Sequence, residues 1–269
     1  MTDRFTGFDL FSCNNVRQMF GELFDKKVFI QDKTNVPMLE ILNAQFVANE
    51  TSIFGKIDDE YLKKELDWYN TQVNNINAMD SPVPKLWAST AGSNGETNSN
   101  YGWAIYSSQN WSQFQFCLNE LTKNPTSRRA IMIYTRPSMQ TDYNKNGMND
   151  FMCTNNVQYF IRHNRLETIV NMRSNDAVFG YKCDRFWQMT VRDKLFYDLK
   201  EIYKDLSRGS IVWNVGSLHM YERHFFLVWA WIKTEKHDVS MKEYGELRAE
   251  YDNKEKRARQ MGQEILGGS

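Results

Sequence analysis

The sequence predicts an α+β fold in which helices pack in layers against a large β-sheet. Apolar residues recur at helical spacing in three segments, 58–70, 113–123 and 184–206. Short apolar runs typical of strands occupy 129–135, 157–163, 166–173 and 211–215. With 269 residues, 41% of them hydrophobic, the chain is long enough to bury a full core. No repeat or Pro/Gly/Ser-rich linker divides it, so we expect one domain over residues 1–269.

The first two helical segments are bounded by polar residues or proline. In 58–70, the apolar positions around Leu62 and Trp68 carry Glu65 inward on the same face. The helix 113–123 ends before Asn124-Pro125, because proline disfavours helical geometry in the residue that precedes it. Residues 129–135 then form a buried strand.

Two strand candidates form a hairpin, because only Asn164-Arg165 separates 157–163 from 166–173. Cys153 therefore lies just before one strand, and Arg173 ends the next. In 184–206, large apolar residues keep an i, i+4, i+8 spacing, which predicts a long helix with Asp184 near its start.

The last third of the chain contains one more strand and two more helices. The strand 211–215 leads into Gly216-Ser217-Leu218-His219-Met220-Tyr221, and an apolar helix follows at 222–232. From about residue 234 the sequence is highly charged, which predicts a solvated helix that ends at Gly267-Gly268.

Charge and composition exclude several classes of function. Lys+Arg 33 balances Asp+Glu 33, so no net field draws the chain to nucleic acid or to an anionic membrane. No apolar run reaches the roughly 18 residues of a membrane span, and the polar start lacks a signal-peptide core, which predicts a cytoplasmic protein. The four cysteines form no CxxC pair and the four histidines are scattered, so we expect no metal site and no disulfide framework.

Candidate chemistry centres on Cys153, which stands in a polar turn between ordered segments. Arg128-Arg129 and Arg173-Ser174 supply the forked donors and the hydroxyl that a phosphate monoester requires, and nearby positive charge favours a thiolate. The alternatives are a cysteine that is only a small buried apolar residue and arginines that form only surface salt bridges.

Four motifs resemble the thymidylate synthase family in order and approximate spacing over residues 25–235. They are Phe151-Met152-Cys153-Thr154-Asn155, Asn171-Met172-Arg173-Ser174-Asn175-Asp176, Ser127-Arg128-Arg129 and Gly216-Ser217-Leu218-His219-Met220-Tyr221. Three longer runs, 98–105, 133–140 and 213–219, are similar to the T-even phage branch of this family that hydroxymethylates deoxycytidylate. The resemblance implies the thymidylate synthase fold, with a mixed sheet whose face forms a dimer interface.

The resemblance also implies a covalent reaction. Cys153 matches the nucleophile that adds to carbon 6 of the pyrimidine, so that carbon 5 attacks the methylene group of methylenetetrahydrofolate, the folate co-substrate. Glu65 matches a glutamate that orders water and moves protons at the base. Without the family, Glu65 would be interpreted as an exposed helix carboxylate.

The remaining matches are binding residues. Those implied for the substrate dCMP are Lys33, Tyr101, Arg128, Arg129, Arg173, Ser174, Asn175, His219 and Tyr221. The arginines and Ser174 bind phosphate, and Arg128 and Arg129 do so in the partner subunit of a homodimer. Lys33 replaces a loop arginine, so it keeps the charge but loses the bidentate fork. His219 and Tyr221 bind the deoxyribose hydroxyl, Tyr101 lies beside the nucleophile, and Trp87 and Asp176 line the folate pocket.

Asp184 is the residue that distinguishes the base, because the synthases carry asparagine there to recognise uracil. A carboxylate accepts from the cytosine amino group and can hold the proton that the ring nitrogen gains when the thiolate adds. The alternative is that Asp184 caps the following helix, and the two roles are compatible.

The product depends on whether water or hydride reaches the exocyclic methylene group. Thr154-Asn155 replaces the histidine that usually follows the nucleophile, and the charged tail replaces an apolar closing segment; both favour water. The alternatives are a dCMP or dUMP methylase that produces dihydrofolate and a non-catalytic nucleotide-binding scaffold. By the same resemblance, the setting is the cytoplasm of a phage-infected host, with phage nucleotide-synthesis enzymes as candidate partners.

Overall fold

The computed structural model describes residues 11–238 and 241–260. Its contacts form two compact units: unit 1 contains 1–57, 174–185 and 215–269, and unit 2 contains 58–173 and 186–214. Three elements run through both units, namely β6 (Arg165–Asp176), α7 (Gly180–Lys200) and β7 (Ser207–Tyr221). The single domain over 1–269 stays a prediction.

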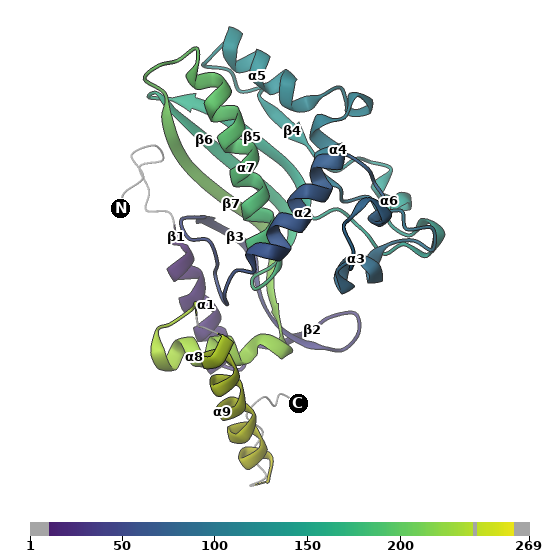
Figure 1. The fold of residues 1–269 in the computed structure, drawn as a ribbon. Coiled ribbons are helices and arrows are strands. Elements are labelled where there is room, and N and C mark those ends of the chain that lie inside the picture. The colour runs from purple at the N-terminus through teal and green to yellow at the C-terminus, as the bar shows by residue number, and fades with distance from the viewer. Residues whose placement is uncertain (1–10, 239–240, 261–269) are drawn as a thin grey trace. The chain divides into compact units, whose positions relative to one another are not determined.

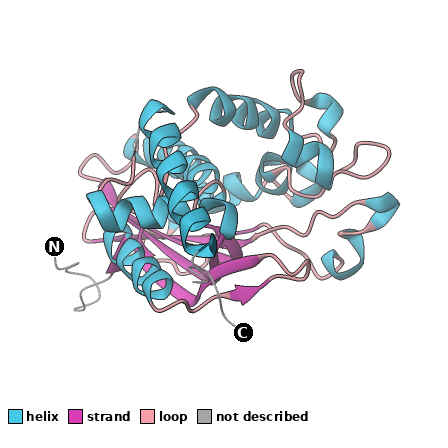
Figure 2. Cartoon of the chain, turned by 90° about the horizontal axis from the view of Figure 1, so that it is seen from below, coloured by secondary structure: helices cyan, strands magenta, loops and turns pink. Residues whose placement is uncertain are grey.

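The strands form one hydrogen-bonded sheet, drawn in magenta in Figure 2, in the order β1-β3-β7-β6-β5-β4, with β2 paired to β3. The other strands are β1 (Phe11–Ser12), β2 (Ile30–Gln31), β3 (Pro37–Val47), β4 (Ile131–Ile133) and β5 (Thr154–Arg162). Because β1 is parallel to β3 whereas β4, β5 and β6 are antiparallel, the sheet is mixed. The predicted α+β fold with a mixed sheet is confirmed.

In unit 1, an aromatic core holds two helices together. The helices of this unit are α1 (Cys13–Asp25), α8 (Phe225–Thr234), α9 (Met241–Gln260) and the 3₁₀ turn η4 (Glu222–His224). Ser12 caps α1 through a reciprocal bond with Asn15, and the ring of Phe24 packs edge-on against Phe225. The charged tail is helical over α9, as predicted, whereas its predicted end at Gly267-Gly268 lies outside the described residues.

Unit 2 contains the first two predicted helices, at the places where the sequence put them (Figure 1). Its helices are α2 (Asp59–Thr71), α3 (Lys85–Thr90), α4 (Tyr101–Tyr106), α5 (Gln113–Lys123) and α6 (Met139–Asp142), with 3₁₀ turns η1 (Ile76–Ala78), η2 (Ser108–Asn110) and η3 (Lys145–Gly147). Asp58 caps α2 by accepting from the backbone of Tyr61. Leu62, Glu65 and Trp68 lie on the buried face of α2, as the helical spacing predicted.

The predicted hairpin is present as β5 and β6. Its turn is His163-Asn164, with φ values of 48° and 58°, the geometry of a two-residue turn that suits twisted strands. Both strands are longer than the apolar runs suggested, so Cys153 precedes β5 directly while Arg173 lies within β6 rather than at its end.

The long helix α7 begins four residues earlier and ends six residues earlier than its spacing predicted. A turn fixed by Asp176, whose Oδ1 accepts from the backbone of Val178 and Phe179 at 2.7 Å, leads into its start at Gly180. Trp187, one of its predicted apolar positions, is 2% exposed, and full burial of such side chains contributes roughly 1.5–3 kcal/mol each. Leu206 is also buried, but in the turn after the helix, which periodicity alone does not distinguish from another helical turn.

Three further boundaries differ from the sequence prediction. The strand predicted at 129–135 is paired only over β4, whereas the strand predicted at 211–215 extends over all of β7 and includes His219 and Tyr221. The helix predicted at 222–232 begins as η4 and continues as α8 to Thr234. No helix in the described part of the chain combines the length and apolarity that a bilayer crossing requires.

Candidate active site

Cys153 is half-buried in the loop that enters β5, and Arg173 on the neighbouring strand binds this loop. The Arg173 backbone N–H donates to the carbonyl of Cys153 at 2.9 Å, and its Nε donates to the carbonyl of Met152 at 3.0 Å. The Arg173 Nη2 lies 3.6 Å from the Cys153 Sγ, and the guanidinium stacks over the Phe151 ring at 4.7 Å. A positive charge at this distance stabilises negative charge on sulfur.

Tyr101 contacts the residue that follows Cys153. Tyr101 opens α4 and is 4% exposed, and its hydroxyl accepts from the Thr154 Oγ1 at 3.0 Å. Its ring stacks on Tyr69 of α2, with centroids 5.2 Å apart. The tyrosine that the resemblance placed beside the nucleophile therefore lies next to its loop.

Glu65 is buried in unit 2 and bound by two hydrogen-bond donors. It is 6% exposed, and its Oε1 accepts from the indole N–H of Trp87 at 3.0 Å and from the Tyr61 hydroxyl at 3.2 Å. Trp87 itself is 8% exposed and packs against Trp68. The interpretation of Glu65 as an exposed helix carboxylate is therefore wrong, and the structure pairs it with a residue predicted for the folate pocket.

In unit 1, the carboxylate of Asp184 is held by an amide. The Asn175 Nδ2 donates to the Asp184 Oδ2 at 2.7 Å, and Asn175 is 2% exposed. A Cβ at Gly180 would lie 3.0 Å from the same Nδ2, so glycine leaves room for this pair.

Asp184 does not cap α7, because it lies four residues inside the helix. The carboxylate that binds backbone N–H groups before α7 is that of Asp176, a residue predicted for the folate pocket. The alternative that Asp184 caps the helix is therefore wrong, because it depended on a helix start placed four residues too late.

His219 and Tyr221 lie two residues apart on β7, so their side chains lie on the same face of the strand. Their ring centroids are 5.2 Å apart at an interplanar angle of 81°. The His219 carbonyl accepts from the backbone of Ala177, one residue after Asp176, at 2.8 Å. The guanidinium of Arg223 covers the Tyr221 ring at 4.5 Å.

Lys33 is exposed on a tight turn of unit 1. The Asp32 Oδ1 accepts from the Thr34 backbone and hydroxyl, both at 2.7 Å, and from the Val36 backbone at 2.9 Å. These bonds, the hydroxyl of Thr34 first, lower the pKa of Asp32 below its ordinary value. The turn is thus ordered by its own residues and presents the lysine to solvent.

Arg128 and Arg129 are both exposed in unit 2. The Arg129 Nε and Nη2 donate to the Glu120 Oε1 at 3.1 and 3.0 Å, so this arginine forms the surface ion pair that was the alternative interpretation. The Ser127 hydroxyl donates to the same Glu120 carboxylate and accepts from the Arg129 backbone N–H. Because Glu120 belongs to α5, these bonds attach the segment that carries the two arginines to α5.

The predicted site residues fall into two sets, each described within its own unit. Unit 2 contains Glu65, Trp87, Tyr101, Arg128, Arg129, Cys153 and Arg173. Unit 1 contains Lys33, Ser174, Asn175, Asp176, Asp184, His219 and Tyr221. Within them the structure joins Cys153 to Arg173, Glu65 to Trp87, and Asn175 to Asp184. The described residues include no group of three or more metal-ligating side chains placed to hold an ion.

Sequence reasoning missed two residues that contact the candidate site. Tyr61 donates to Glu65, which its i, i+4 spacing would have indicated. Asp150 is 7% exposed and bonds to Asn98 and Ser99, some fifty residues earlier in the chain. The sequence gives one signal for Asp150, namely that this carboxylate stands near a cysteine in a segment between two predicted ordered elements.

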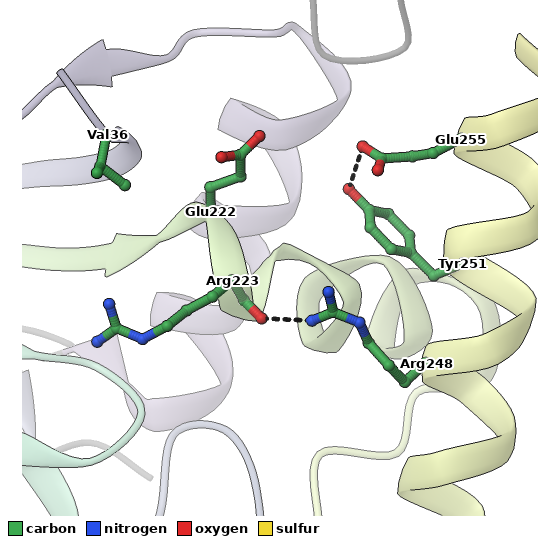
Figure 3. A pocket seen from close by; sticks show the side chains of 6 residues that line it. All are labelled: Val36, Glu222, Arg223, Arg248, Tyr251 and Glu255. Atoms are coloured by element: carbon green, nitrogen blue, oxygen red, sulfur yellow. Dashed lines mark hydrogen bonds between the residues drawn. The ribbon is translucent and has the colours of Figure 1, made fainter. Parts of the chain in front are cut away.

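A cavity of about 320 Å³ in unit 1 has none of the predicted site residues in its lining. It is lined by Val36, Glu222, Arg223, Arg248, Tyr251 and Glu255 (Figure 3). The Arg248 Nη1 donates to the Arg223 carbonyl at 2.7 Å, and the Tyr251 hydroxyl donates to Glu255 at 3.1 Å. Its charged lining residues are two arginines and two glutamates, so their formal charges balance.

His224, in the 3₁₀ turn after β7, is a buried imidazole among charged groups. It is 4% exposed, its ring packs edge-on against Phe179, and its Nδ1 has no hydrogen-bond partner among the described residues. Burial is the main cause that lowers the pKa of His224 to about 4. The negative charge of Asp176 opposes this shift, and the positive charges of Arg223, Lys182 and Arg248 add to it. The imidazole is therefore neutral near pH 7.

The sequence profile described as thymidylate synthase matches residues 19–255, and the chain belongs to this family. A solved structure, the thermostable thymidylate synthase A from Bacillus subtilis, superposes with a TM-score of 0.59 over 81% of this chain and 83% of that one. At 20% identity it supports the fold alone.

Two curated relatives are much more similar in sequence. The deoxycytidylate 5-hydroxymethyltransferase of Enterobacteria phage T4 is 51% identical over 88% of this chain and 97% of that enzyme. The enzyme of the same name from Enterobacteria phage T6 is 50% identical over the same shares. A thymidylate synthase from Fusobacterium nucleatum is 28% identical over 60% of this chain and 56% of its own length.

Proposed function

We propose that this protein transfers a one-carbon unit from methylenetetrahydrofolate to carbon 5 of dCMP and hydrates it, giving 5-hydroxymethyl-dCMP and tetrahydrofolate. The observation that carries the proposal is the 51% identity, over 97% of its length, with an enzyme named deoxycytidylate 5-hydroxymethyltransferase. Because the identity extends over nearly the whole of that enzyme, it cannot come from one shared motif.

Cys153 is the nucleophile in this proposal. Its sulfur adds to carbon 6 of cytosine, and carbon 5 becomes the electron-rich carbon that accepts the one-carbon unit. The Arg173 guanidinium, 3.6 Å from the sulfur, supports this role because it stabilises the thiolate. When bound, methylenetetrahydrofolate supplies the carbon that is transferred.

Asp184 recognises cytosine in this proposal. Its carboxylate accepts from the exocyclic amino group, and the Asn175 amide, 2.7 Å away, holds the carboxylate in one orientation. Uracil would place a carbonyl oxygen against the carboxylate and leave both acceptors unpaired. Such a mismatch costs roughly 1–3 kcal/mol, which corresponds to a ten- to hundredfold preference.

Glu65 moves protons and orders water at the base in this proposal. Its burial and its two donors, Trp87 and Tyr61, support a fixed carboxylate rather than a solvated one. The residues present fit a folate: Trp87 offers an indole fixed by Glu65, and Asp176 offers a carboxylate fixed by two backbone N–H groups. We assign these two residues to the folate.

The nucleotide's phosphate and sugar have their own proposed ligands. Arg173 supplies its positive charge and Ser174 its hydroxyl to the phosphate, with Lys33 as a further cation. His219 and Tyr221, on one face of β7, bind the deoxyribose hydroxyl. Asn175, already bonded to Asp184, and Tyr101, bonded to Thr154, complete the substrate set.

We further propose a homodimer in which Arg128 and Arg129 bind the phosphate in the partner subunit. Support comes from their exposure and from β5, where buried Val157 and Tyr159 alternate with half-buried Gln158 and Phe160. Half-buried side chains on one face of a strand are typical of a sheet surface that a second layer covers, and in this proposal the partner subunit supplies that layer. Light scattering should give twice the chain mass. A hybrid of Arg128→Ala with Cys153→Ser should be more active than either variant alone, and a monomeric enzyme with full activity would refute the dimer.

The decisive experiment is identification of the products by mass spectrometry. Protein incubated with dCMP and methylenetetrahydrofolate should give 5-hydroxymethyl-dCMP and tetrahydrofolate in equal amounts. Formation of dihydrofolate and a 5-methyl nucleotide would reject hydration in favour of hydride transfer. Absence of any product from dCMP, with turnover of dUMP, would reject the cytosine assignment. The reaction belongs in the cytoplasm of an infected host cell, where the enzyme would meet other phage enzymes of nucleotide synthesis.

A further inference from the structure

Asp150 lies three residues before Cys153 and fastens the start of its loop to the segment that opens α4. Its Oδ2 accepts from the backbone N–H groups of Asn98, at 2.7 Å, and Ser99, at 2.9 Å, and its Oδ1 accepts from the Ser99 hydroxyl at 2.6 Å. The Asn98 side chain donates to the Asp150 carbonyl at 3.0 Å. Asp150 is 7% exposed, so these fixed donors take the place of water as hydrogen-bond partners of its carboxylate.

The same segment, residues 98–101, binds the loop again on the other side of Cys153. Thr154 donates from its hydroxyl to Tyr101 at 3.0 Å. The chain from Asp150 to Thr154 is thus attached at both ends to the segment 98–101, through Asn98, Ser99 and Tyr101. The position of the Cys153 sulfur therefore depends on this segment as well as on Arg173, which binds the carbonyls of Met152 and Cys153.

Residues 98–101 are themselves held firmly within unit 2. Asn100, which is 0% exposed, caps α4 and donates to the carbonyl of Trp68 in α2 at 2.9 Å. Arg136 donates to the Asn98 Oδ1 at 2.7 Å. The loop is consequently fixed to α2 and α4, and not only to its own strand.

The two oxygens of Asp150 face three donors, namely two backbone N–H groups and the Ser99 hydroxyl. An amide in its place has one acceptor oxygen, and its NH₂ group is paired only if the Ser99 hydroxyl turns round to accept. In either case the negative charge that strengthens all three bonds is lost. Nucleophilic attack requires the sulfur within a few tenths of an ångström of its productive place, and a misplacement of about 1 Å can cost a hundredfold in rate.

We propose that Asp150 is a positioning residue that holds the Cys153 sulfur for attack through its bonds to Asn98 and Ser99. The reaction that the sulfur performs is taken from the proposed function. The effect of Asp150 on the position of the sulfur does not depend on that function. The buried Asp150–Ser99 contact thus contributes to the catalytic rate, although neither residue is among the proposed substrate-binding residues.

The test compares Asp150→Asn, Ser99→Ala and the double variant with the unaltered protein. We expect Asp150→Asn to lower kcat for dCMP by about 10- to 100-fold while KM changes by less than about threefold. Ser99→Ala should give a smaller fall, and the fall in the double variant should be less than the product of the two single falls, because both changes act on the same contact.

A second readout needs no turnover. The rate of alkylation of Cys153 by iodoacetamide, followed by peptide mass spectrometry, should change by more than about threefold in Asp150→Asn, since reactivity depends on the surroundings of the thiolate. Cys183, also half-buried, is the internal reference and should react as before. If the unaltered protein makes no 5-hydroxymethyl-dCMP, the proposed function fails while this comparison still decides the role of Asp150.

Glu50→Gln controls for stability, because the Glu50 carboxylate is bound by Arg17 and His237 and not by the loop. Unchanged kcat and alkylation in folded Asp150→Asn would overturn the proposal. An equal loss of kcat in Glu50→Gln at the same fall in Tm would also overturn it, because the loss would then follow from stability. If Asp150→Asn does not fold, Ser99→Ala decides by the same readouts.

Discussion

At the scale of single residues, the candidate site consists of reactive groups that are each paired with a neighbour of complementary chemistry. The Cys153 sulfur has a guanidinium beside it, Glu65 has an indole N–H, and Asp184 has an amide. Such pairs fix a side chain before the substrate arrives, so that less reorganisation is needed during the reaction. The role of each group can therefore be tested by a substitution that exchanges its reactive atom and keeps its shape, such as sulfur for oxygen or a carboxylate for an amide.

Cys153→Ser replaces the sulfur by a hydroxyl, which is not ionised near pH 7 and is a far weaker nucleophile. We expect release of the carbon 5 proton of dCMP to fall by at least about a thousandfold, because no adduct forms at carbon 6. Equilibrium binding of dCMP should remain within about threefold, since the phosphate and sugar ligands are intact. Tritium release and calorimetry measure the two quantities, and near-normal release would remove Cys153 from the mechanism.

Asp184→Asn exchanges an acceptor-only group for one that both accepts and donates, which suits uracil. We expect the ratio of kcat/KM for dCMP to that for dUMP to fall by about ten- to a hundredfold. The matched control is Asp142→Asn, a carboxylate-to-amide change at a buried aspartate bound by Arg136 and Ser138. The ratio should not change in the control. An unchanged ratio in Asp184→Asn would place recognition of the base elsewhere.

Among these residues, the sequence allowed the reactive groups to be predicted but not most of their partners. Cys153 and Glu65 were named from motifs. Helical spacing put Glu65 on the inward face of its helix, whereas its residue type alone favoured an exposed carboxylate, and the side chain is buried. The bond between Asp150 and Ser99 joins residues 51 positions apart, and periodicity contains no information about such contacts. The turn that Asp176 forms before α7 was missed for a local reason, because the start of α7 was placed too late.

At the scale of elements, α4 is the helix on which the candidate site of unit 2 depends most. It begins with Tyr101, and its second residue, Gly102, lies against α2, which carries Glu65. A Cβ at Gly102 would meet the Tyr69 carbonyl oxygen at 1.8 Å and its carbon at 2.6 Å. Only glycine lets the two helices approach this closely.

Gly102→Ala should therefore destabilise the protein and lower its activity together. Overpacking against backbone costs typically 1–3 kcal/mol, and here the obstacle is a carbonyl that has no rotamer to change. The control is Gly245→Ala in α9, where an added Cβ meets nothing within 4 Å. Alanine there should stabilise the helix by roughly 0.5–1 kcal/mol. Denaturant unfolding of both variants tests the contrast, and equal effects would contradict it.

Helices and strands were easier to predict than their ends. The helix at 113–123 was placed correctly because proline follows it and its face is amphipathic. β7 was found at its apolar middle only. Its first four residues are polar or glycine, and after the exposed Gly216 the buried Leu218 and Met220 alternate with half-buried residues, so the full length of the strand depends on pairing with neighbours. Periodicity detects a buried face, whereas an element often ends at a contact with residues distant in sequence.

At the scale of the whole molecule, buried histidines make stability depend on pH. His224 has a folded pKa of about 4 against about 6.5 in the unfolded chain, because its burial disfavours the charged form. Between these two values the unfolded chain binds a proton that the folded chain does not. This contribution is therefore complete above pH 6.5 and is lost as the pH falls toward 4.

From pH 7 to pH 5, His224 alone should lower the free energy of unfolding by about 2 kcal/mol. His224→Gln, which is neutral at both values, should remove that part of the dependence while keeping a polar group of similar size. His237→Gln is the comparison: burial also lowers the pKa of His237, but its side chain is 30% exposed and pairs with Glu50, so its share should be smaller. Urea titrations of all three proteins at pH 7 and pH 5 measure the differences. If His224→Gln kept the full pH dependence, the charge would have to be taken up by another group, and the buried imidazole would be protonated in the folded chain.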